Sequence, residues 1–152
     1  TKQYVDVNIT AYAKKIIVPI TFDNNYATTS ADFVRIPLQI TVPAAADVFP
    51  TTTTIMARLC IDYLTQNGTQ TDAIGEAGLT EWTTAMTGIP TAVSGSEITM
   101  ADSNQTWLKI ISGTPFAITA NKTYQVIFRR TAGAGGNPNV QIEAATLILV
   151  YS

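Results

Sequence analysis

Glu76, Glu81 and Trp82 are the residues whose types and spacing come nearest to a catalytic pattern. Two carboxyl groups can act as acid and base in glycoside hydrolysis, and an aromatic ring beside them would suit a sugar. The same residues also fit a solvated loop in which one tryptophan anchors the chain to the core. We favour this second interpretation, and we expect no catalytic residues.

Histidine does not occur among the 152 residues of the chain. Its absence excludes Ser-His-Asp and Cys-His catalytic arrangements, the ordinary zinc sites, and the side chain best suited to proton transfer near neutral pH. The glycine-rich run from Gly133 to Gly136 has neither the Walker nor the dinucleotide-binding spacing. We interpret this run as a turn, and we expect no cofactor.

Two short polar runs, Asp23-Asn24-Asn25 and Asp102-Ser103-Asn104, carry side-chain oxygen atoms of the kind that calcium prefers. Asp and Asn also form turns without any metal, because their side chains bond to the backbone nearby. We favour the turns for both runs, and we expect no metal site.

Charged residues make up only 13% of the sequence, and the net charge is −2. An ordinary globular protein has about 25% charged residues. The surface must therefore be rich in uncharged polar side chains, which cost less to desolvate than ions do. Such a surface favours broad protein contacts, although a neutral surface on an ordinary monomer is the alternative. The nine Lys and Arg residues are scattered, so we expect no nucleic-acid partner, which would need a basic face.

Cys60 is the only cysteine, so no disulfide can form within the chain, and we expect this residue to pack inside a strand. No apolar run reaches the ~18 residues of a membrane-spanning helix, so we expect no membrane partner. No signal peptide is recognisable, but a cleaved one would leave the same sequence, so the compartment stays open.

Alternating apolar and polar side chains predict eight to ten strands, which indicates an all-β sandwich, with a jelly roll as the best match. We expect one domain over residues 1–152. Pro19 and Pro37 lie inside two of the strands, and these should therefore be edge strands or contain bulges. The predicted strands before the C-terminal pair span residues 3–12, 14–22, 33–42, 55–64, 96–100, 106–111 and 115–119. The residues expected to line the core are Val34, Ile36, Leu38, Ile40, Leu59, Ile61, Val126 and Phe128.

The C-terminal residues 122–152 contain the clearest pair of strands. Side chains alternate from Tyr124 to Arg129 and again from Val140 to Tyr151, with a run of Gly, Asn and Pro between them. This pattern predicts a β-hairpin, which we expect to form the central pair of one sheet. The end of the last strand is apolar on both faces, so we expect either both faces covered or an interface between subunits.

Residues 66–94 form a long polar stretch that breaks the rhythm of the strands. Within it, Leu79, Trp82 and Met86 lie at helical spacing, and a stop signal of Gly and Pro follows them. We therefore predict one short helix over residues 79–87. We expect the whole stretch to be an insertion that projects from one end or edge of the sandwich and contacts a neighbouring molecule.

The charged residues of this stretch are the acids Asp72, Glu76 and Glu81, with no Lys or Arg nearby in the sequence to pair with them. We expect apolar residues of the helix and of the last strand to make the contacts between subunits. These candidate interface residues are Leu79, Trp82, Met86, Leu147, Leu149 and Tyr151.

The run from Phe116 to Val126, the glycine loop, and the run from Val140 to Tyr151 resemble the end of β-sandwich domains in phage and viral decoration, fibre and spike proteins. The resemblance implies a homotrimer that coats a capsid or binds a host. Carbohydrate-binding modules end in similar hairpins. The run from Val5 to Thr10 resembles the donor strand of fimbrial subunits, without the C-terminal pattern and disulfide of pilins.

Together these observations predict a non-enzymatic structural protein of a bacteriophage or other virus. It would be a capsid decoration, fibre or spike domain on the virion surface. It would self-associate, with a homotrimer as the expected oligomer, and attach to another virion or capsid protein. One alternative is a carbohydrate-binding or adhesin-type module, secreted or at the cell surface. Another is a self-assembling fibre or pilus subunit.

The surface of the sandwich distinguishes these alternatives. Coplanar exposed aromatic rings, such as Trp82 with Tyr63 or Tyr26, would favour sugar binding. A wide face of Thr, Ala and Val would favour assembly.

Overall fold

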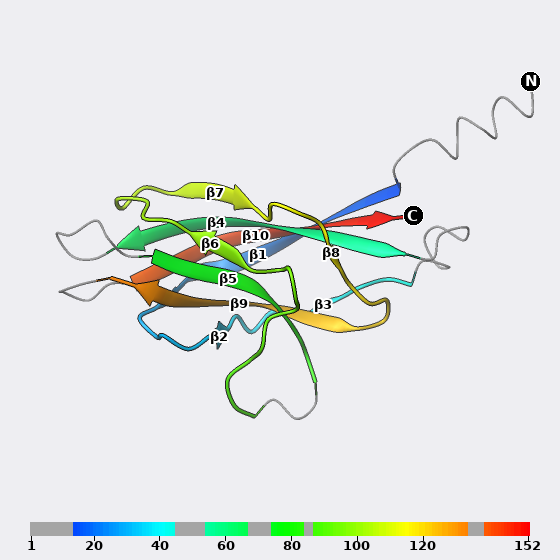
Figure 1. Ribbon diagram of the computed structural model, residues 1–152, viewed down its shortest axis with the longest axis horizontal. Coiled ribbons are helices and arrows are strands. Elements are labelled where there is room, and N and C mark those ends of the chain that lie inside the picture. The colour runs from blue at the N-terminus through cyan, green and yellow to red at the C-terminus, as the bar shows by residue number, and fades with distance from the viewer. Residues whose placement is uncertain (1–13, 45–53, 67–73, 84–86, 134–138) are drawn as a thin grey trace, which may run out of the picture.

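The computed structural model describes residues 14–44, 54–66, 74–83, 87–133 and 139–152, and these form ten strands in two antiparallel sheets (Figure 1). The predicted strand over residues 3–12 lies outside the described residues. The strands are β1 (Lys14–Thr28), β2 (Val34–Arg35), β3 (Ile40–Thr41), β4 (Ile55–Gln66), β5 (Ile74–Glu81), β6 (Ile98–Met100), β7 (Leu108–Ile111), β8 (Phe116–Ala117), β9 (Thr123–Ala132) and β10 (Asn139–Tyr151).

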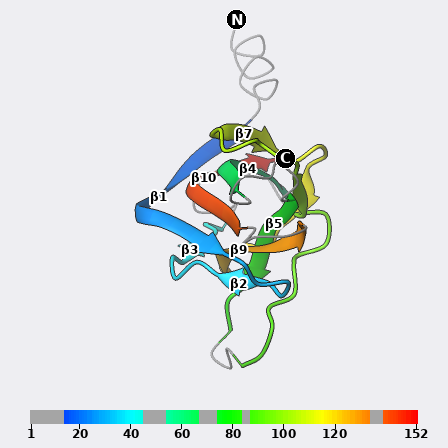
Figure 2. The same cartoon turned by 90° about the vertical axis from the view of Figure 1, so that its left-hand side faces the viewer.

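Sheet A has the strand order β1-β10-β4-β7, and β8 also pairs with β4. Sheet B has the order β2-β9-β5-β6, and β3 also pairs with β9. Each sheet interleaves strands from the two halves of the chain, which is the arrangement of a jelly roll. Viewed along the strands, the two sheets face each other as the two layers of a sandwich (Figure 2), so the all-β sandwich is confirmed.

The core lies between the sheets and follows the alternation of the strands. On β4, the residues from Ile55 to Thr65 are buried at every second position and half-buried in between. Of the eight predicted core residues, six are buried, and Val34 and Leu38 are half-buried and pack against them. The six buried residues are Ile36, Ile40, Leu59, Ile61, Val126 and Phe128.

Both prolines mark sheet edges, as predicted. Pro19 lies in β1, which is the edge strand of sheet A. Pro37 lies between β2 and β3, which pair one after the other with the same side of β9. The strand predicted over residues 33–42 is therefore divided in two, because proline cannot donate a hydrogen bond to the ladder.

The prediction of a C-terminal hairpin is wrong, because β9 and β10 lie in different sheets. β10 is central in sheet A, between β1 and β4, and β9 is central in sheet B, between β2 and β5. The connection between them is longer than the two to five residues of most hairpin loops. It can therefore carry the chain from one sheet to the other.

The predicted helix over residues 79–87 is also wrong, and no helix occurs in the described residues. Residues 79–81 are the end of β5, which pairs with β9 on one side and with β6 on the other. Residues 84–86 lie outside the described residues. Because β5 is a central strand of sheet B, the stretch 66–94 is not an insertion into the sandwich.

The run Asp23-Asn24-Asn25 does not end a strand, contrary to the prediction of a turn. β1 continues through it, and its register with β10 moves from Thr21 opposite Ala144 to Tyr26 opposite Ile142. β1 thus advances five residues while β10 advances two, which makes the run a bulge in an edge strand. Bulges of this kind bend an edge strand and increase its twist.

Candidate assembly surface

Four of the six candidate interface residues point into the sandwich. Leu79 on β5 and Leu147, Leu149 and Tyr151 on β10 are at most 2% exposed. These side chains belong to the core and are not free to contact a neighbouring subunit in this conformation. Trp82 is half-buried directly after β5, and Met86 lies outside the described residues.

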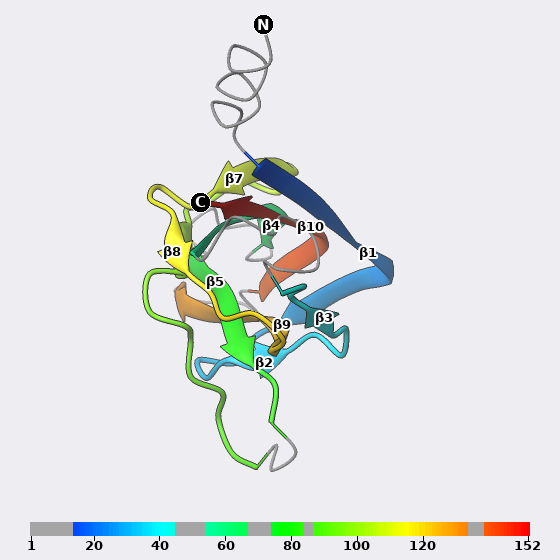
Figure 3. The same cartoon turned by 90° about the vertical axis from the view of Figure 1, so that its right-hand side faces the viewer.

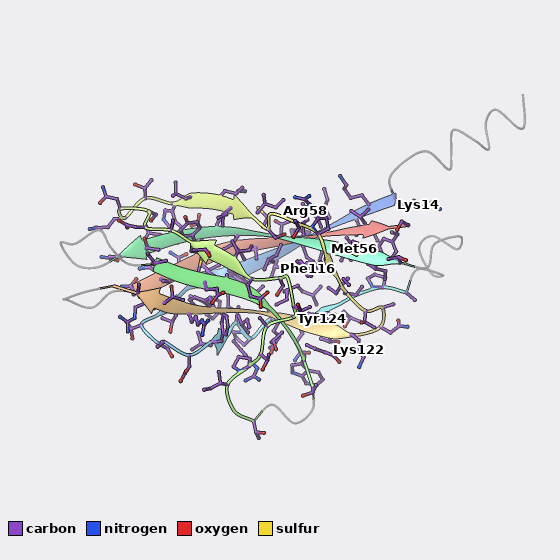
Figure 4. The ribbon with its side chains drawn as sticks, in the orientation of Figure 1. Lys14, Met56, Arg58, Phe116, Lys122 and Tyr124 are labelled. Atoms are coloured by element: carbon purple, nitrogen blue, oxygen red, sulfur yellow. The ribbon has the colours of Figure 1, made fainter. Side chains whose placement is uncertain are left out.

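The other side of β10 carries the apolar residues that face outward. Thr146, Ile148 and Val150 are half-buried and alternate with the core residues, so their side chains point away from sheet B. Their neighbours in register continue the apolar surface on both sides. Ile17 of β1 lies opposite Ile148, and Met56 of β4 lies opposite Val150 (Met56 is labelled in Figure 4).

This outward surface, which we call the sheet A face, is open within the described part of the chain. Ile17 is 62% exposed, Ile111 is 44% exposed and Trp107 is 36% exposed. Its apolar members are Ile17, Pro19, Met56, Cys60, Leu64, Trp107, Ile111, Ile148 and Val150. Large apolar side chains that gather on one open face mark a surface for contact with another molecule.

Three charged side chains on the same face have partners within the chain, and Lys15, which lies opposite Val150, is exposed there as well. Lys109 on β7 forms an ion pair with Asp62 on β4, with 3.2 Å between Nζ and Oδ1. The guanidinium of Arg58 donates to the backbone carbonyls of Ser112 and Gly113, each at 3.3 Å (Figure 4). The Asp62 carboxylate is thus neutralised within its own chain, whereas Arg58 has hydrogen-bond partners but keeps its positive charge.

Cys60 lies on the sheet A face between Thr146 and Ile111 in register. Partial burial raises the pKa of its thiol above the ordinary value, nearby Lys109 lowers it, and Asp62 raises it. The thiol is thus protonated at neutral pH, and a protonated thiol is a poor nucleophile. This agrees with the expectation that Cys60 packs within a strand.

The outer face of sheet B differs, because the chain itself covers it. The segment from residue 87 to 92 crosses over β9, since the carbonyl of Gly88 accepts a hydrogen bond from Arg35 on β2 at 3.2 Å. At the β5 side, the Thr80 hydroxyl donates to the carbonyl of Thr91 at 2.8 Å. Ile127 on β9 is completely buried as a result, although it faces away from the core. Gly88 and Thr91 of the predicted insertion are therefore hydrogen-bonded to the protein's own sheet, although residues 87–89 are exposed.

Glu76 and Glu81 do not form a catalytic pair. They are five residues apart on one strand, so their side chains leave β5 on opposite faces. Each carboxylate pairs with a cation on or beside β9. Glu76 accepts two hydrogen bonds from Arg129, and Glu81 lies 2.8 Å from the ammonium group of Lys122. No Lys or Arg lies near these acids in the sequence, and their cation partners come from a distant part of the chain.

The aromatic residues proposed for a sugar platform do not share a face. Tyr63 points into the core, and Tyr26 packs edge-on against Phe22 with 5.4 Å between ring centroids. Trp82 follows β5 in the other sheet, where its backbone N–H donates to the carbonyl of Thr123. These rings cannot present coplanar surfaces to one sugar chain.

The run Asp102-Ser103-Asn104 forms the predicted turn. The Asp102 carboxylate accepts hydrogen bonds from the backbone N–H of Asn104 at 2.9 Å and from the hydroxyl of Thr65 at 3.2 Å. Asn104 and Gln105 have positive φ angles of 49° and 60°. No group of three or more metal-ligating His, Cys, Asp or Glu side chains occurs in the described ranges. These ranges also contain no helix long and apolar enough to span a bilayer.

Comparison with solved structures finds distant likenesses to this chain, one of which is a viral coat protein. The structure resembles the coat protein of Tobacco streak virus, with a TM-score of 0.42 and 12% sequence identity, over 90% of this chain and 86% of that chain. No protein-family model matches the sequence, and no curated protein matches it significantly. A likeness this distant does not carry function from one protein to the other.

Proposed function

We propose that this protein is a non-enzymatic structural subunit of a virion, a capsid decoration, fibre or spike domain, and that it self-associates through the sheet A face. The observation that carries the proposal is the contrast between the two outer faces. The chain covers sheet B with its own residues, whereas sheet A leaves Ile17, Ile111 and Trp107 exposed. Trp107 is the one aromatic ring among the described members of this face and the other members are not aromatic, which favours assembly over a sugar platform of paired rings.

A second copy of the same chain is a suitable partner for this face. Two identical apolar faces are complementary to each other, and closed symmetric assemblies are built from such self-complementary contacts. Asp62 does not oppose this contact, because Lys109 neutralises it within its own chain, and the hydrogen bonds of Arg58 to backbone carbonyls lower the cost of covering its guanidinium group. Burial of the open apolar side chains supplies the driving force.

The size of the face predicts that this contact alone is weak. Four strands at ~4.8 Å spacing and about seven residues at ~3.3 Å give roughly 400 Å² per subunit. A stable interface buries about 800 Å² per partner. Assembly through this face therefore needs a second contact, or many copies held together on a particle surface.

Two isoleucines of equal exposure test the proposal. Ile17 on the sheet A face and Ile89 on the segment over sheet B are each 62% exposed. We expect Ile17→Glu to lower the oligomer mass measured by light scattering, because the charge must be desolvated in the contact. Ile89→Glu, the matched control, should assemble like the wild type. The melting temperature of the dissociated domain should change little in either variant.

If both variants assemble like the wild type, the sheet A face is not the contact and the proposal fails. The assignment to a virion is supported by the resemblance of the C-terminal runs to phage and viral domains. Mass spectrometry of purified particles from the source of this sequence tests it, since a coat or decoration subunit is present in many copies. Absence of the chain from those particles would remove the virion from the proposal and leave the self-association.

A further inference from the structure

A groove runs along one side of the sandwich, where the two sheets do not meet. It has a volume of about 350 Å³, and β1 and β3 lie on this same side of the molecule (Figure 3). The residues that line it are Val18, Pro19, Ile20, Leu38, Gln39, Ile40 and Thr41. Its walls are thus the edge strand of sheet A and the edge strand of sheet B.

The groove suits an extended strand better than a folded domain. Ile20 and Ile40 are buried at its base, and Val18 and Leu38 are half-buried and pack against the core. Within the described residues, β1 pairs only with β10 and β3 only with β9, so each wall has one side without a strand partner. An edge with free backbone groups beside an apolar channel is the arrangement that accepts an added strand.

The chain itself contains a segment with the matching pattern. In residues 3–11, Val5, Val7, Ile9 and Ala11 alternate with polar side chains. Such a segment has one apolar side, which needs a partner surface, and one polar side that tolerates water. At ~3.3 Å per residue, nine residues span about 30 Å, which is long enough to cross the groove and reach beyond it.

We propose that residues 3–11 of one copy lie as an added strand in the groove of a neighbouring copy, with Val5, Val7 and Ile9 facing Ile20 and Ile40. The inference rests on the proposed self-association, and it adds the second contact that the small sheet A face requires. The donor is a neighbour because pairing with the chain's own β1 would need a tight reversal between Ala11 and Lys15. No Gly, Pro, Asn or Asp occurs there to form one.

A strand donated in this way makes a head-to-tail contact. Each copy gives its N-terminal segment to one neighbour and receives a segment from another. Such contacts generate a ring if the rotation between copies closes, and a filament if it does not. A closed ring satisfies every groove whatever the number of copies, and the expected trimer is one such ring.

Disulfide cross-linking between two different chains tests the contact directly. In a Cys60→Ser background, one chain carries Asn8→Cys, on the polar side of the segment, and a second chain, distinguished by a mass tag, carries Gln39→Cys, at an exposed position of the groove. After mixing under mild oxidation, we expect a mixed dimer to form at least tenfold faster than with a second chain carrying Ile89→Cys. Equal rates, or no mixed dimer, would overturn the inference.

Substitutions within the segment give an independent measurement. We expect Ile9→Asp to lower the oligomer mass, because the charge would enter the apolar groove, whereas Asn8→Asp on the polar side should leave the mass unchanged. Equal effects of the two substitutions, or no effect of Ile9→Asp, would contradict the proposal.

The two proposals fail in different ways. If Ile17→Glu abolishes assembly and the mixed dimer never forms, the sheet A face is retained and the strand is rejected. If Ile17→Glu has no effect while the mixed dimer forms and Ile9→Asp lowers the mass, the strand is retained and the sheet A face is rejected.

Discussion

Gly75 on β5 shows how closely single residues fix the packing between the two sheets. A Cβ added there would lie 2.6 Å from Cγ2 of Val140 on β10, 2.9 Å from the carbonyl oxygen of Arg129 and 2.9 Å from Cε of Met100. The methyl group of Met100 can move, but the Arg129 carbonyl belongs to the sheet ladder. Glycine has a low propensity for strands, but here the close approach of the neighbouring atoms requires a residue without a side chain.

We expect Gly75→Ala to lower the free energy of unfolding by roughly 1–3 kcal/mol, because an extra methyl group in a filled core forces neighbours apart. Gly113→Ala is the control, since a Cβ at Gly113 would meet nothing within 4 Å. Denaturant melts of both variants measure the difference. Equal stability of the two variants would mean that β5 can shift away from β10 without cost.

At the scale of elements, the alternation of buried and exposed side chains along a strand could be predicted from the sequence, but the pairing of the strands could not. β4 could be predicted because its inward and outward residues alternate over its whole length. β5 could not be predicted, because its residues Gly75, Ala77 and Gly78 have low strand propensity. This segment forms a strand because of its pairing with the strands on either side. The sequence also does not say which strands pair, so β9 and β10 looked like one hairpin.

The residues of the candidate assembly surface could be predicted only in part, for the same reasons. The end of β10 has apolar side chains on both faces, as its sequence indicates, but its inward set could not be told from its outward set. The exposed residues of β1 and β7 can be assigned to the sheet A face only when the register of these strands with β10 and β4 is known. The pairing of Glu76 with Arg129 joins residues 53 positions apart, so no local pattern could reveal it.

The ladder of β5 continues past the end of β6 through the side chain of Ser96. Its hydroxyl accepts a hydrogen bond from the backbone N–H of Leu79 at 3.0 Å, and the N–H of Val93 donates to the Leu79 carbonyl at 2.7 Å. We expect Ser96→Ala to cost about 1–3 kcal/mol of stability, because it leaves a buried N–H without a partner. Ser94→Ala, at an exposed position, is the control. A thermal melt that does not distinguish the two would show that water or backbone replaces the hydroxyl.

At the scale of the whole molecule, the described residues close one face of the sandwich and leave the other open. The covered face of sheet B needs no partner to exclude water from Ile127. The sheet A face and the groove between β1 and β3 meet at Pro19, and the other described residues of the two surfaces are separate, so one assembly can use both contacts. Two weak contacts in one assembly strengthen each other, because the second forms within an existing complex.

Cys60 reports on this assembly without any added label, because it is the chain's only thiol and lies on the sheet A face. Its pKa is raised by burial, so alkylation by iodoacetamide should be slow at neutral pH and become faster as the pH approaches the raised value. At fixed pH, we expect the rate per thiol to fall as the protein concentration rises through the range of assembly. Contact with a second copy would both block access and desolvate the thiolate further. Ile17→Glu should remove this dependence on concentration and Ile89→Glu should keep it. A rate that is independent of concentration in the wild type, while light scattering shows oligomers, would place the contact on another surface.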